Sequence, residues 1–296
     1  MRVLRHAAGA LLVCAATLLV GGARHAAYGE DTRTVSAKHA AASCPKAEFR
    51  VVVDVGHTLD VPGAMSAHGA TEYAFNLQLA GDVKQALVDA GFDKTVLLIT
   101  AVAPLRGLFE RVQRANEMRA DLFLSIHHDS VPDYLLQTWE YEGQQYGFND
   151  QFPGYALFIS NDNPDRAGSL LFGKLLGKAL QARGLHYTPH YTQAFMRNRR
   201  RELVDADAGV YRYDQLVVLR STRMPAVLLE AGSIVNRQEE LELAGTERRS
   251  LTSAAVAAAV EDFCAARAHP NIARAAKHSV PHAVQPHGAN AAPSAH

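Results

Sequence analysis

Apolar and polar residues follow two different periods along the chain, and these periods predict strands and helices in alternation. Residues 49–55 form a nearly continuous β-branched run, as is typical of a strand buried on both faces of a parallel sheet. Apolar residues then recur at helical spacing over 72–90, and Gly91 ends that segment. The same criteria predict strands at 95–100, 121–126, 155–160, 216–219 and 226–230, and helices at 108–119, 164–183 and 247–266.

This alternation of strand and helix predicts an α/β fold, with a mostly parallel twisted sheet flanked by helices on both faces. Two stretches, 131–153 and 185–211, show no clear period. The first is rich in aromatic residues and holds the only tryptophan, Trp139. Long irregular loops in a compact domain are usually functional or disordered, so the aromatic rings are expected either to meet a substrate or to pack onto the domain.

Composition agrees with one sizeable folded domain. The chain has 296 residues, of which 48% are hydrophobic and 20% charged, which is enough apolar material for a core. Its formal net charge is zero, which argues against a nucleic-acid partner because such partners usually require a basic surface. We therefore expect a single folded domain over 48–267.

The two ends of the chain differ in composition from this domain. Residues 1–27 carry Arg2 and Arg5, a short apolar stretch and then small residues, as a secretory signal peptide does; an uncleaved membrane anchor is the alternative. Residues 28–47 have the polar, alanine-rich composition of a linker. Residues 268–296 are rich in Ala, His and Pro and are expected to be a disordered tail. An exported protein is thus predicted, with the periplasm as its compartment.

Export makes the cysteines informative. Removal of the signal peptide takes away Cys14 and leaves Cys44 and Cys264. Two cysteines in an oxidising compartment can pair, and we expect this bond to join the two ends of the folded domain. The alternative is two separate thiols, with Cys264 buried on its helix.

Four polar side chains stand where predicted strands end or where the next helix begins. His57 and His127 follow the first and third strands, Glu230 ends the last, and Glu72 opens the first helix. Ligands of open α/β sheets bind at the carboxyl ends of the strands, so these four side chains are expected at one edge. Two imidazoles and one carboxylate suit zinc with an open fourth position, and a further glutamate can serve as general base.

The chain resembles the zinc-dependent N-acetylmuramoyl-L-alanine amidases of the type-3 amidase family over about residues 49–265. The resemblance rests on VVVDVGH (51–57), Glu72 with Asn76, ERVQRAN (110–116), DLFLSIHHDS (121–130) and VLRSTRMPAVLLEAGSIVN (218–236). It implies hydrolysis of the amide between the lactyl group of N-acetylmuramic acid and L-alanine in peptidoglycan. It also implies one zinc ion held by His57, Glu72 and His127, with Glu230 as the catalytic residue.

Two positions depart from the family pattern. Thr58 and Leu59 replace a glycine pair after the first histidine, and His128 replaces a small residue after the second. Successive side chains of a strand point to opposite faces, so only one of His127 and His128 should reach the metal. His127 is the expected ligand from its place in the motif.

Three further polar residues have less certain roles. Asp54 lies inside a buried strand, where it either orients a zinc-bound histidine or accepts hydrogen bonds from loop backbone. Arg111 is expected to anchor its helix through a carboxylate. Arg220, at the end of the predicted strand 216–219, either holds a carboxylate of the stem peptide or forms a structural ion pair.

The function expected from the residues and the resemblance together is a peptidoglycan amidase. A non-catalytic cell-wall binding protein is the first alternative, although an intact Glu230 argues against it, and a zinc peptidase acting on other peptides is the second. The expected partner is peptidoglycan, both glycan strand and stem peptide, and a protein activator stays open.

Overall fold

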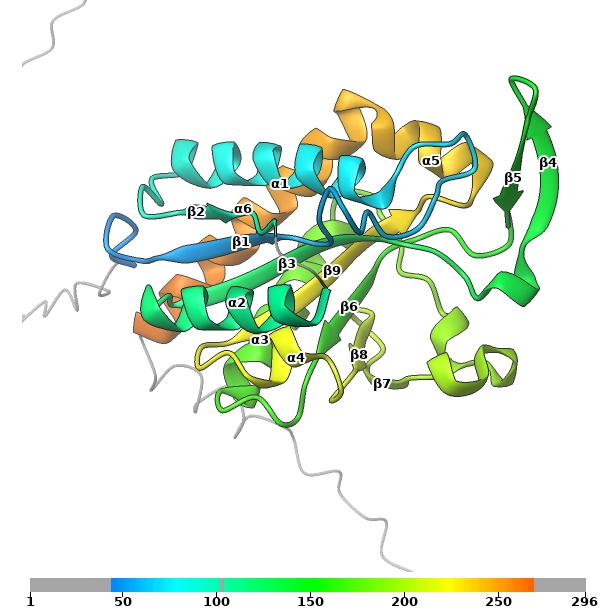
Figure 1. Ribbon diagram of the computed structural model, residues 1–296. Coiled ribbons are helices and arrows are strands. Elements are labelled where there is room, and N and C mark those ends of the chain that lie inside the picture. Colours follow the sequence, from blue (N-terminus) through cyan, green and yellow to red (C-terminus); the bar gives the residue numbers. More distant parts are fainter. Residues whose placement is uncertain (1–43, 102–103, 269–296) are drawn as a thin grey trace, which may run out of the picture. The chain divides into compact units, whose positions relative to one another are not determined.

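Seven strands form one sheet in the computed structural model, which describes residues 44–101 and 104–268 (Figure 1). The strands are β1 (Val51–Val55), β2 (Val96–Leu98), β3 (Leu122–Asp129), β6 (Ala156–Ile159), β7 (Glu202–Asp205), β8 (Val210–Arg212) and β9 (Ala226–Ser233), in the order β2-β1-β3-β9-β6-β8-β7. The pairs β1/β2, β1/β3, β3/β9 and β6/β8 are parallel, whereas β6/β9 and β7/β8 are antiparallel. The sheet is therefore mixed with a parallel majority, in agreement with the predicted class.

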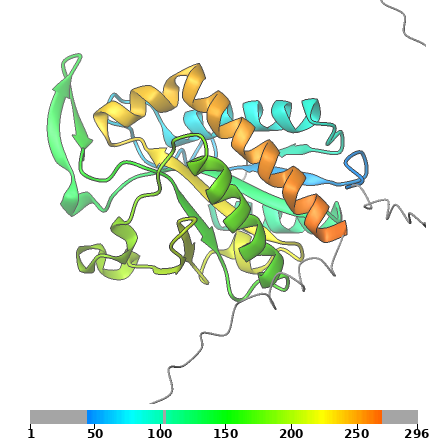
Figure 2. The ribbon, with the colours of Figure 1, turned by 180° about the vertical axis from the view of Figure 1, so that it is seen from behind.

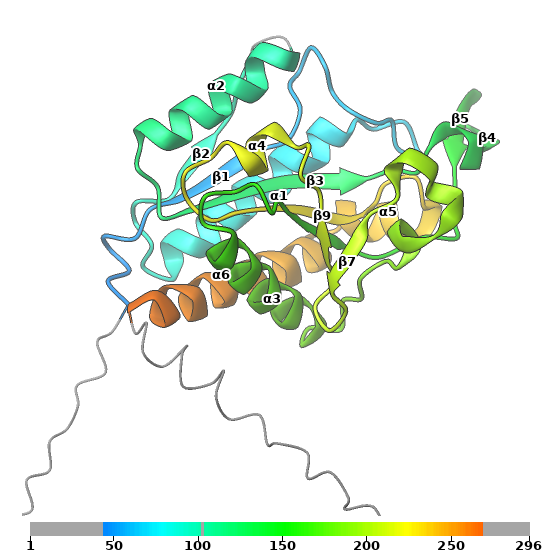
Figure 3. The ribbon, with the colours of Figure 1, turned by 90° about the horizontal axis from the view of Figure 1, so that it is seen from below.

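Helices cover both faces of this sheet. One face carries α1 (Glu72–Asp89), α3 (Arg166–Gln181), α5 (Arg237–Ala244) and α6 (Thr246–Ala268), and the other carries α2 (Pro104–Glu117) and the single turn α4 (Val217–Arg220). Figure 2 shows α6 and α3 crossing one face, and Figure 3 shows α2 and α4 on the opposite side of the strands. Strand β1 is buried along its whole length because both of its faces are covered, which explains its continuous apolar sequence.

Residues 216–219 are not a strand, so that prediction was wrong. Residues 217–220 form α4, in which the amides of Arg220 and Ser221 bond to the carbonyls of Leu216 and Val217. The nearest strand, β9, is already paired with β3 on one side and with β6 on the other. No further strand can therefore pair with β9. The backbone of Val218 and Leu219 forms a helical turn instead, and their apolar side chains are buried.

The two stretches without a clear period both contain secondary structure. Within 131–153, β4 (Gln137–Tyr141) and β5 (Gln144–Phe148) form an antiparallel hairpin that extends away from the main sheet (Figures 1 and 2). It is preceded by the short helix η1 (Asp133–Leu135). Within 185–211 lie the short helices η2 (His190–Thr192) and η3 (Ala194–Arg199), followed by β7 and β8.

A disulfide joins the two ends of the described domain. Cys44, just before β1, is bonded to Cys264 in α6, with their Cα atoms 5.3 Å apart, so the predicted pairing is confirmed. Residues 44–47 of the predicted linker are thereby tied to the domain. The predicted signal peptide, the rest of that linker and the tail from residue 269 onward lie outside the described residues. Among the helices that are described, none has the length and apolar character needed to cross a bilayer.

Candidate metal centre

Three adjacent parallel strands bring the predicted site residues to one edge of the sheet. His57 follows β1 after Gly56, His127 lies near the end of β3, and Glu230 lies on β9 as the register partner of His127. Glu72 is the first residue of α1, which follows the loop from β1. Side chains far apart in sequence meet here because β1, β3 and β9 run in the same direction.

His57, Glu72 and His127 converge on one point. Nε2 of His57 is 3.0 Å from Oε2 of Glu72, and Nδ1 of His127 is 2.9 Å from Oε1 of the same carboxylate. One ligand atom from each residue lies within 4.8 Å of the other two. The three residues thus form a site of two imidazoles and one carboxylate that can hold a metal ion.

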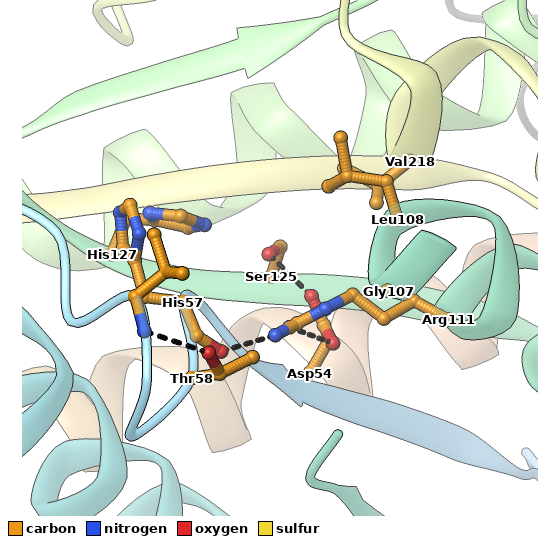
Figure 4. A pocket seen from close by; sticks show the side chains of 10 residues that line it. Asp54, His57, Thr58, Gly107, Leu108, Arg111, Ser125, His127 and Val218 are labelled. Atoms are coloured by element: carbon orange, nitrogen blue, oxygen red, sulfur yellow. Dashed lines mark hydrogen bonds and ion pairs between the residues drawn. The ribbon is translucent and has the colours of Figure 1, made fainter. Parts of the chain in front are cut away.

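The backbone of His57 is held in an unusual conformation. Its φ is 66°, in the left-handed region that non-glycine residues rarely occupy. The guanidinium of Arg111, which is buried, donates to the carbonyl oxygens of His57 and Val55 and binds Oδ1 of Asp54 at 2.6 Å (Figure 4). Strained residues persist where their surroundings restrain them, and Arg111 supplies that restraint at the first histidine.

Asp54 is linked to the backbone of His57 through Arg111, and it forms no hydrogen bond with an imidazole among the described residues. Its second oxygen, Oδ2, accepts a hydrogen bond from Ser125 at 2.7 Å. Its bonded partners are thus Arg111 and Ser125 rather than a histidine ring or loop backbone, and its expected role in orienting a zinc-bound histidine stays a prediction. Arg111 anchors α2 through a carboxylate, as its sequence position suggested.

Gly56 allows the second histidine to approach the first strand. A Cβ at this position would lie 2.4 Å from Nε2 of His127, 2.5 Å from its Cε1 and 2.6 Å from its Cδ2. Any larger residue would push the imidazole away from Glu72. The glycine in the motif VVVDVGH is thus required by the close approach of a ring to the backbone.

Glu72 is placed by the start of α1. Thr71 caps the helix by accepting from the amide of Ala74, so Glu72 occupies the first turn, where the helix dipole favours a negative charge. Burial raises the pKa of this carboxyl, but hydrogen bonds from His127 and His57 outweigh that cost and hold the pKa below its ordinary value. The carboxylate is therefore ionised at neutral pH, as a metal ligand must be.

His128 lies outside this cluster. Its side chain is buried on the other side of β3, where Nδ1 is 2.8 Å from Oδ1 of Asn76. Burial lowers its pKa to about 3. The alternation of side chains along the strand thus brings His127, and not His128, beside Glu72 and His57.

Glu230 lies next to the cluster, and its side chain is partly buried. Oε2 is inaccessible to solvent and has no hydrogen-bond partner among the described residues. Burial raises the pKa of this carboxyl well above its ordinary value, and the nearby charges of Asp129 and Glu72 add to the effect. A carboxylate in this environment binds a proton more readily than one in water.

The structure does not bring Arg220 into this group. Arg220 is exposed at the end of α4, and it is not among the residues that line the cavity beside the two histidines. The carbonyl of the next residue, Ser221, accepts from Asn116 near the C-terminal end of α2. The strand end on which its predicted substrate contact rested is absent, and its role stays a prediction.

A cavity of about 230 Å³ opens beside the histidines (Figure 4). Its walls come from the loop after β1, from α2 and from α4, and Asp54 and Arg111 lie among the lining residues. Leu108 and Val218 supply apolar surface opposite His57 and His127. The cavity thus reaches His57 and His127 from the side of α2.

Sequence reasoning missed a second polar group near Glu230. Asp129, at the end of β3, accepts from the hydroxyl of Tyr191 at 2.7 Å, and the guanidinium of Arg199 lies 3.7 Å from the same oxygen. Burial raises the pKa of Asp129 to about 6. Tyr191 and Arg199 belong to the stretch 185–211. The sequence shows that this stretch is rich in Tyr and Arg, but it does not show that Asp129 is their partner.

Comparison with known proteins identifies the family. The family model described as N-acetylmuramoyl-L-alanine amidase matches residues 51–262, and the chain belongs to this family. The N-acetylmuramoyl-L-alanine amidase AmiA of Salmonella typhimurium is 26% identical over 271 residues, which cover 82% of this chain and 86% of that protein.

Solved structures of amidases share the fold. The amidase Ami1 of Mycobacterium smegmatis has a TM-score of 0.56 at 18% identity, covering 73% of this chain and 97% of that one. The catalytic domain of CwlV, an amidase of Bacillus (Paenibacillus) polymyxa, has a TM-score of 0.52 at 24% identity, with coverage of 73% and 97%. The chain is thus an enzyme of the amidase class with the fold of these proteins.

Proposed function

We propose that this amidase cleaves the amide between N-acetylmuramic acid and L-alanine of peptidoglycan at a single zinc ion held by His57, Glu72 and His127. The observation that carries the proposal is the convergence of three ligand atoms within 4.8 Å at the carboxyl edge of the sheet. The family to which the chain belongs supports the bond that is cleaved.

The donor set fits zinc. Two imidazole nitrogens and one carboxylate oxygen are common ligands of catalytic zinc sites, which keep one position open for water or substrate. The carboxylate of Glu72 contributes one negative charge, so a divalent cation leaves the centre net positive. When bound, zinc polarises a substrate carbonyl and lowers the pKa of a water molecule to about 7.

Glu230 is the general base in this proposal. Its buried Oε2 has no partner among the described residues, and its raised pKa suits a group that takes up a proton. It takes the proton of the attacking water and passes it to the leaving nitrogen of L-alanine. Asp54 and Arg111 hold His57 in place during the reaction and do not exchange protons with the substrate.

Release of stem peptide from purified sacculi tests this function. Peptide release by the wild-type protein, with no release by Glu230→Gln, supports an amidase. Binding to sacculi without release would indicate a cell-wall binding protein. Cleavage of unrelated peptides with sacculi left intact would indicate a zinc peptidase.

The proposed compartment is the periplasm, where the disulfide between Cys44 and Cys264 can form and where peptidoglycan lies. The N-terminal sequence favours export through a signal peptide. We retain two further proposals from the sequence, a contact of Arg220 with a stem-peptide carboxylate and regulation by a protein activator. Arg220→Gln tests the first: a raised KM with an unchanged zinc content would support it.

A further inference from the structure

Asn76 links the metal ligand Glu72 to the histidine that does not bind the metal. The Asn76 side chain is fully buried on α1, one turn after Glu72. Its Nδ2 donates to Oε1 of Glu72 and to the carbonyl of Gly56, both at 3.2 Å. Its Oδ1 is 2.8 Å from Nδ1 of His128. One amide thus contacts the ligand carboxylate, the backbone before His57 and the ring of His128.

The partners of this amide determine which atom faces which neighbour. A carbonyl oxygen and a carboxylate oxygen accept hydrogen bonds only, so the nitrogen of Asn76 must face Gly56 and Glu72. The oxygen of Asn76 must then face His128, and it also accepts only. His128 therefore carries a proton on Nδ1 and donates it to Asn76. This holds whether the ring is neutral or charged.

We propose that His128 positions the metal ligand Glu72 through Asn76. The hydrogen bond from His128 holds the amide in the orientation that presents N–H to Oε1 of Glu72. That bond in turn fixes the plane of the carboxylate whose two oxygens face His127 and His57. The inference rests on the zinc centre proposed above, and it assigns a role to the position at which this chain departs from its family pattern.

Loss of the donor would disturb Glu72 for two reasons. Without His128, Oδ1 of Asn76 would be buried with no partner, which costs free energy. The amide could relieve this cost by turning over, and its oxygen would then face the carboxylate oxygen of Glu72 and repel it. Groups that orient metal ligands typically contribute about 10–100-fold to metal affinity, so an effect of that order is expected.

A pair of substitutions separates the hydrogen bond from packing, since the ring of His128 also packs 5.4 Å from that of Phe75. His128→Leu fills most of the space and has no donor. His128→Asn is smaller but places an amide nitrogen near the position of Nδ1. If the hydrogen bond matters, the asparagine variant recovers function although it packs less well.

Zinc affinity, measured by competition with a chelator, is the main readout, and thermal unfolding of the zinc-free proteins is measured beside it. We expect His128→Leu to bind zinc about 10–100-fold more weakly than wild type, and His128→Asn to bind close to wild type. Asn76→Leu should weaken binding at least as much. The double variant with Asn76→Leu and His128→Leu should then bind zinc no more weakly than Asn76→Leu alone, because His128 acts through Asn76.

Three results would overturn the inference. Wild-type zinc affinity in His128→Leu would show that Glu72 needs no such support. Equal losses in the leucine and asparagine variants, in step with their unfolding temperatures, would assign His128 to packing alone. Additive losses in the double variant would exclude action through Asn76. A wild-type protein that binds no zinc would instead overturn the proposed metal centre, and with it this inference.

Discussion

Glu230 on β9 lies directly beside His127 on β3, as its partner in the parallel register of the two central strands. This pairing places the carboxyl of Glu230 next to a proposed metal ligand, while the ligand atoms that converge among the described residues are those of His57, Glu72 and His127. The two residues are 103 positions apart in the chain, and only the pairing of β3 with β9 brings them together. The proposed mechanism assigns metal binding to His127 and proton transfer to Glu230, and both roles can be tested.

Glu230→Gln should lose activity and keep zinc. The amide preserves the size of the side chain but cannot accept the proton of the attacking water. General acid–base groups contribute about 10²–10⁴-fold, so we expect a decrease of that order in kcat on sacculi. Zinc content measured on the same preparation is the control. Activity near wild type would remove Glu230 from the mechanism, and loss of zinc would make it a ligand.

Removal of zinc should abolish activity, and zinc should restore it. The wild-type protein is expected to carry about one zinc ion per chain, in keeping with a single three-ligand site. His57→Ala, Glu72→Ala and His127→Ala should each lose the metal, as measured by elemental analysis. Full activity of a metal-free sample would contradict the assignment. Complete loss of zinc in His128→Ala, with zinc retained in His127→Ala, would make His128 the ligand in place of His127.

The hairpin β4–β5 should support turnover. Nε1 of Trp139 donates to the carbonyl of Ala67 at 2.8 Å, and its ring packs against His68, in the loop that leads to Glu72. Replacing 137–148 with a short turn should slow release of stem peptide from sacculi while zinc is retained. Trp139→Phe is the milder variant, because it removes the bond to Ala67 and part of the ring but keeps the hairpin and an aromatic side chain. Unchanged turnover would leave the hairpin a packing element, and faster turnover would mark it as an inhibitory cover.

Loss of the disulfide should lower stability and leave the metal centre intact. The bond closes a loop with a sequence separation of 220 residues, which by the chain-entropy argument contributes up to roughly 5 kcal/mol. Cys44→Ser with Cys264→Ser should therefore unfold at lower denaturant concentration. Zinc content serves as the control. An unchanged midpoint would show that the packing of α6 alone holds this end of the domain.

Acid should destabilise the fold through His190. This buried imidazole faces Asp129 at 3.7 Å, the charge of Arg199 and the ring of Tyr191. Burial lowers its pKa to about 4, so the unfolded chain binds the proton more readily. The contribution of neutral His190 to the free energy of unfolding is complete above the ordinary histidine pKa of about 6.5. It is lost as pH falls toward 4, by roughly 3 kcal/mol in all.

Denaturant unfolding at several pH values checks this expectation. His190→Gln should show a smaller loss of stability between pH 7 and pH 5 than wild type. His186→Gln, four residues earlier and exposed, is the matched control and should follow wild type. Equal pH dependence in all three proteins would show that other groups dominate acid unfolding.

Local sequence determined much of this protein. Short apolar runs located β1, β3, β6 and β9, and helical spacing located the long helices, because burial on two faces or on one face leaves a recognisable pattern of apolar residues. The convergence of His57, Glu72 and His127 followed from strand ends and from motif order. The disulfide followed from export and from the count of cysteines.

Other features depended on pairing and packing across the fold. Residues 217–220 have the apolar character of a strand, yet both edges of β9 were already taken, so they form a helical turn. The partner of Asp54 is Arg111, and it could not be read from either segment alone, since 57 positions separate them. The hairpin β4–β5 left no clear alternation because it stands outside the core, where neither face is fully covered.

There is a physical reason why some features follow from local sequence and others only from the tertiary structure. A residue's neighbours along the chain decide its local conformation and which face it presents, so strands, helices and strand-end side chains are encoded locally. Contacts between distant segments depend on which strands pair and in which direction. The register of β3 with β9 therefore decides that Glu230 lies beside His127, and the packing of α1 against β3 decides that Asn76 meets His128.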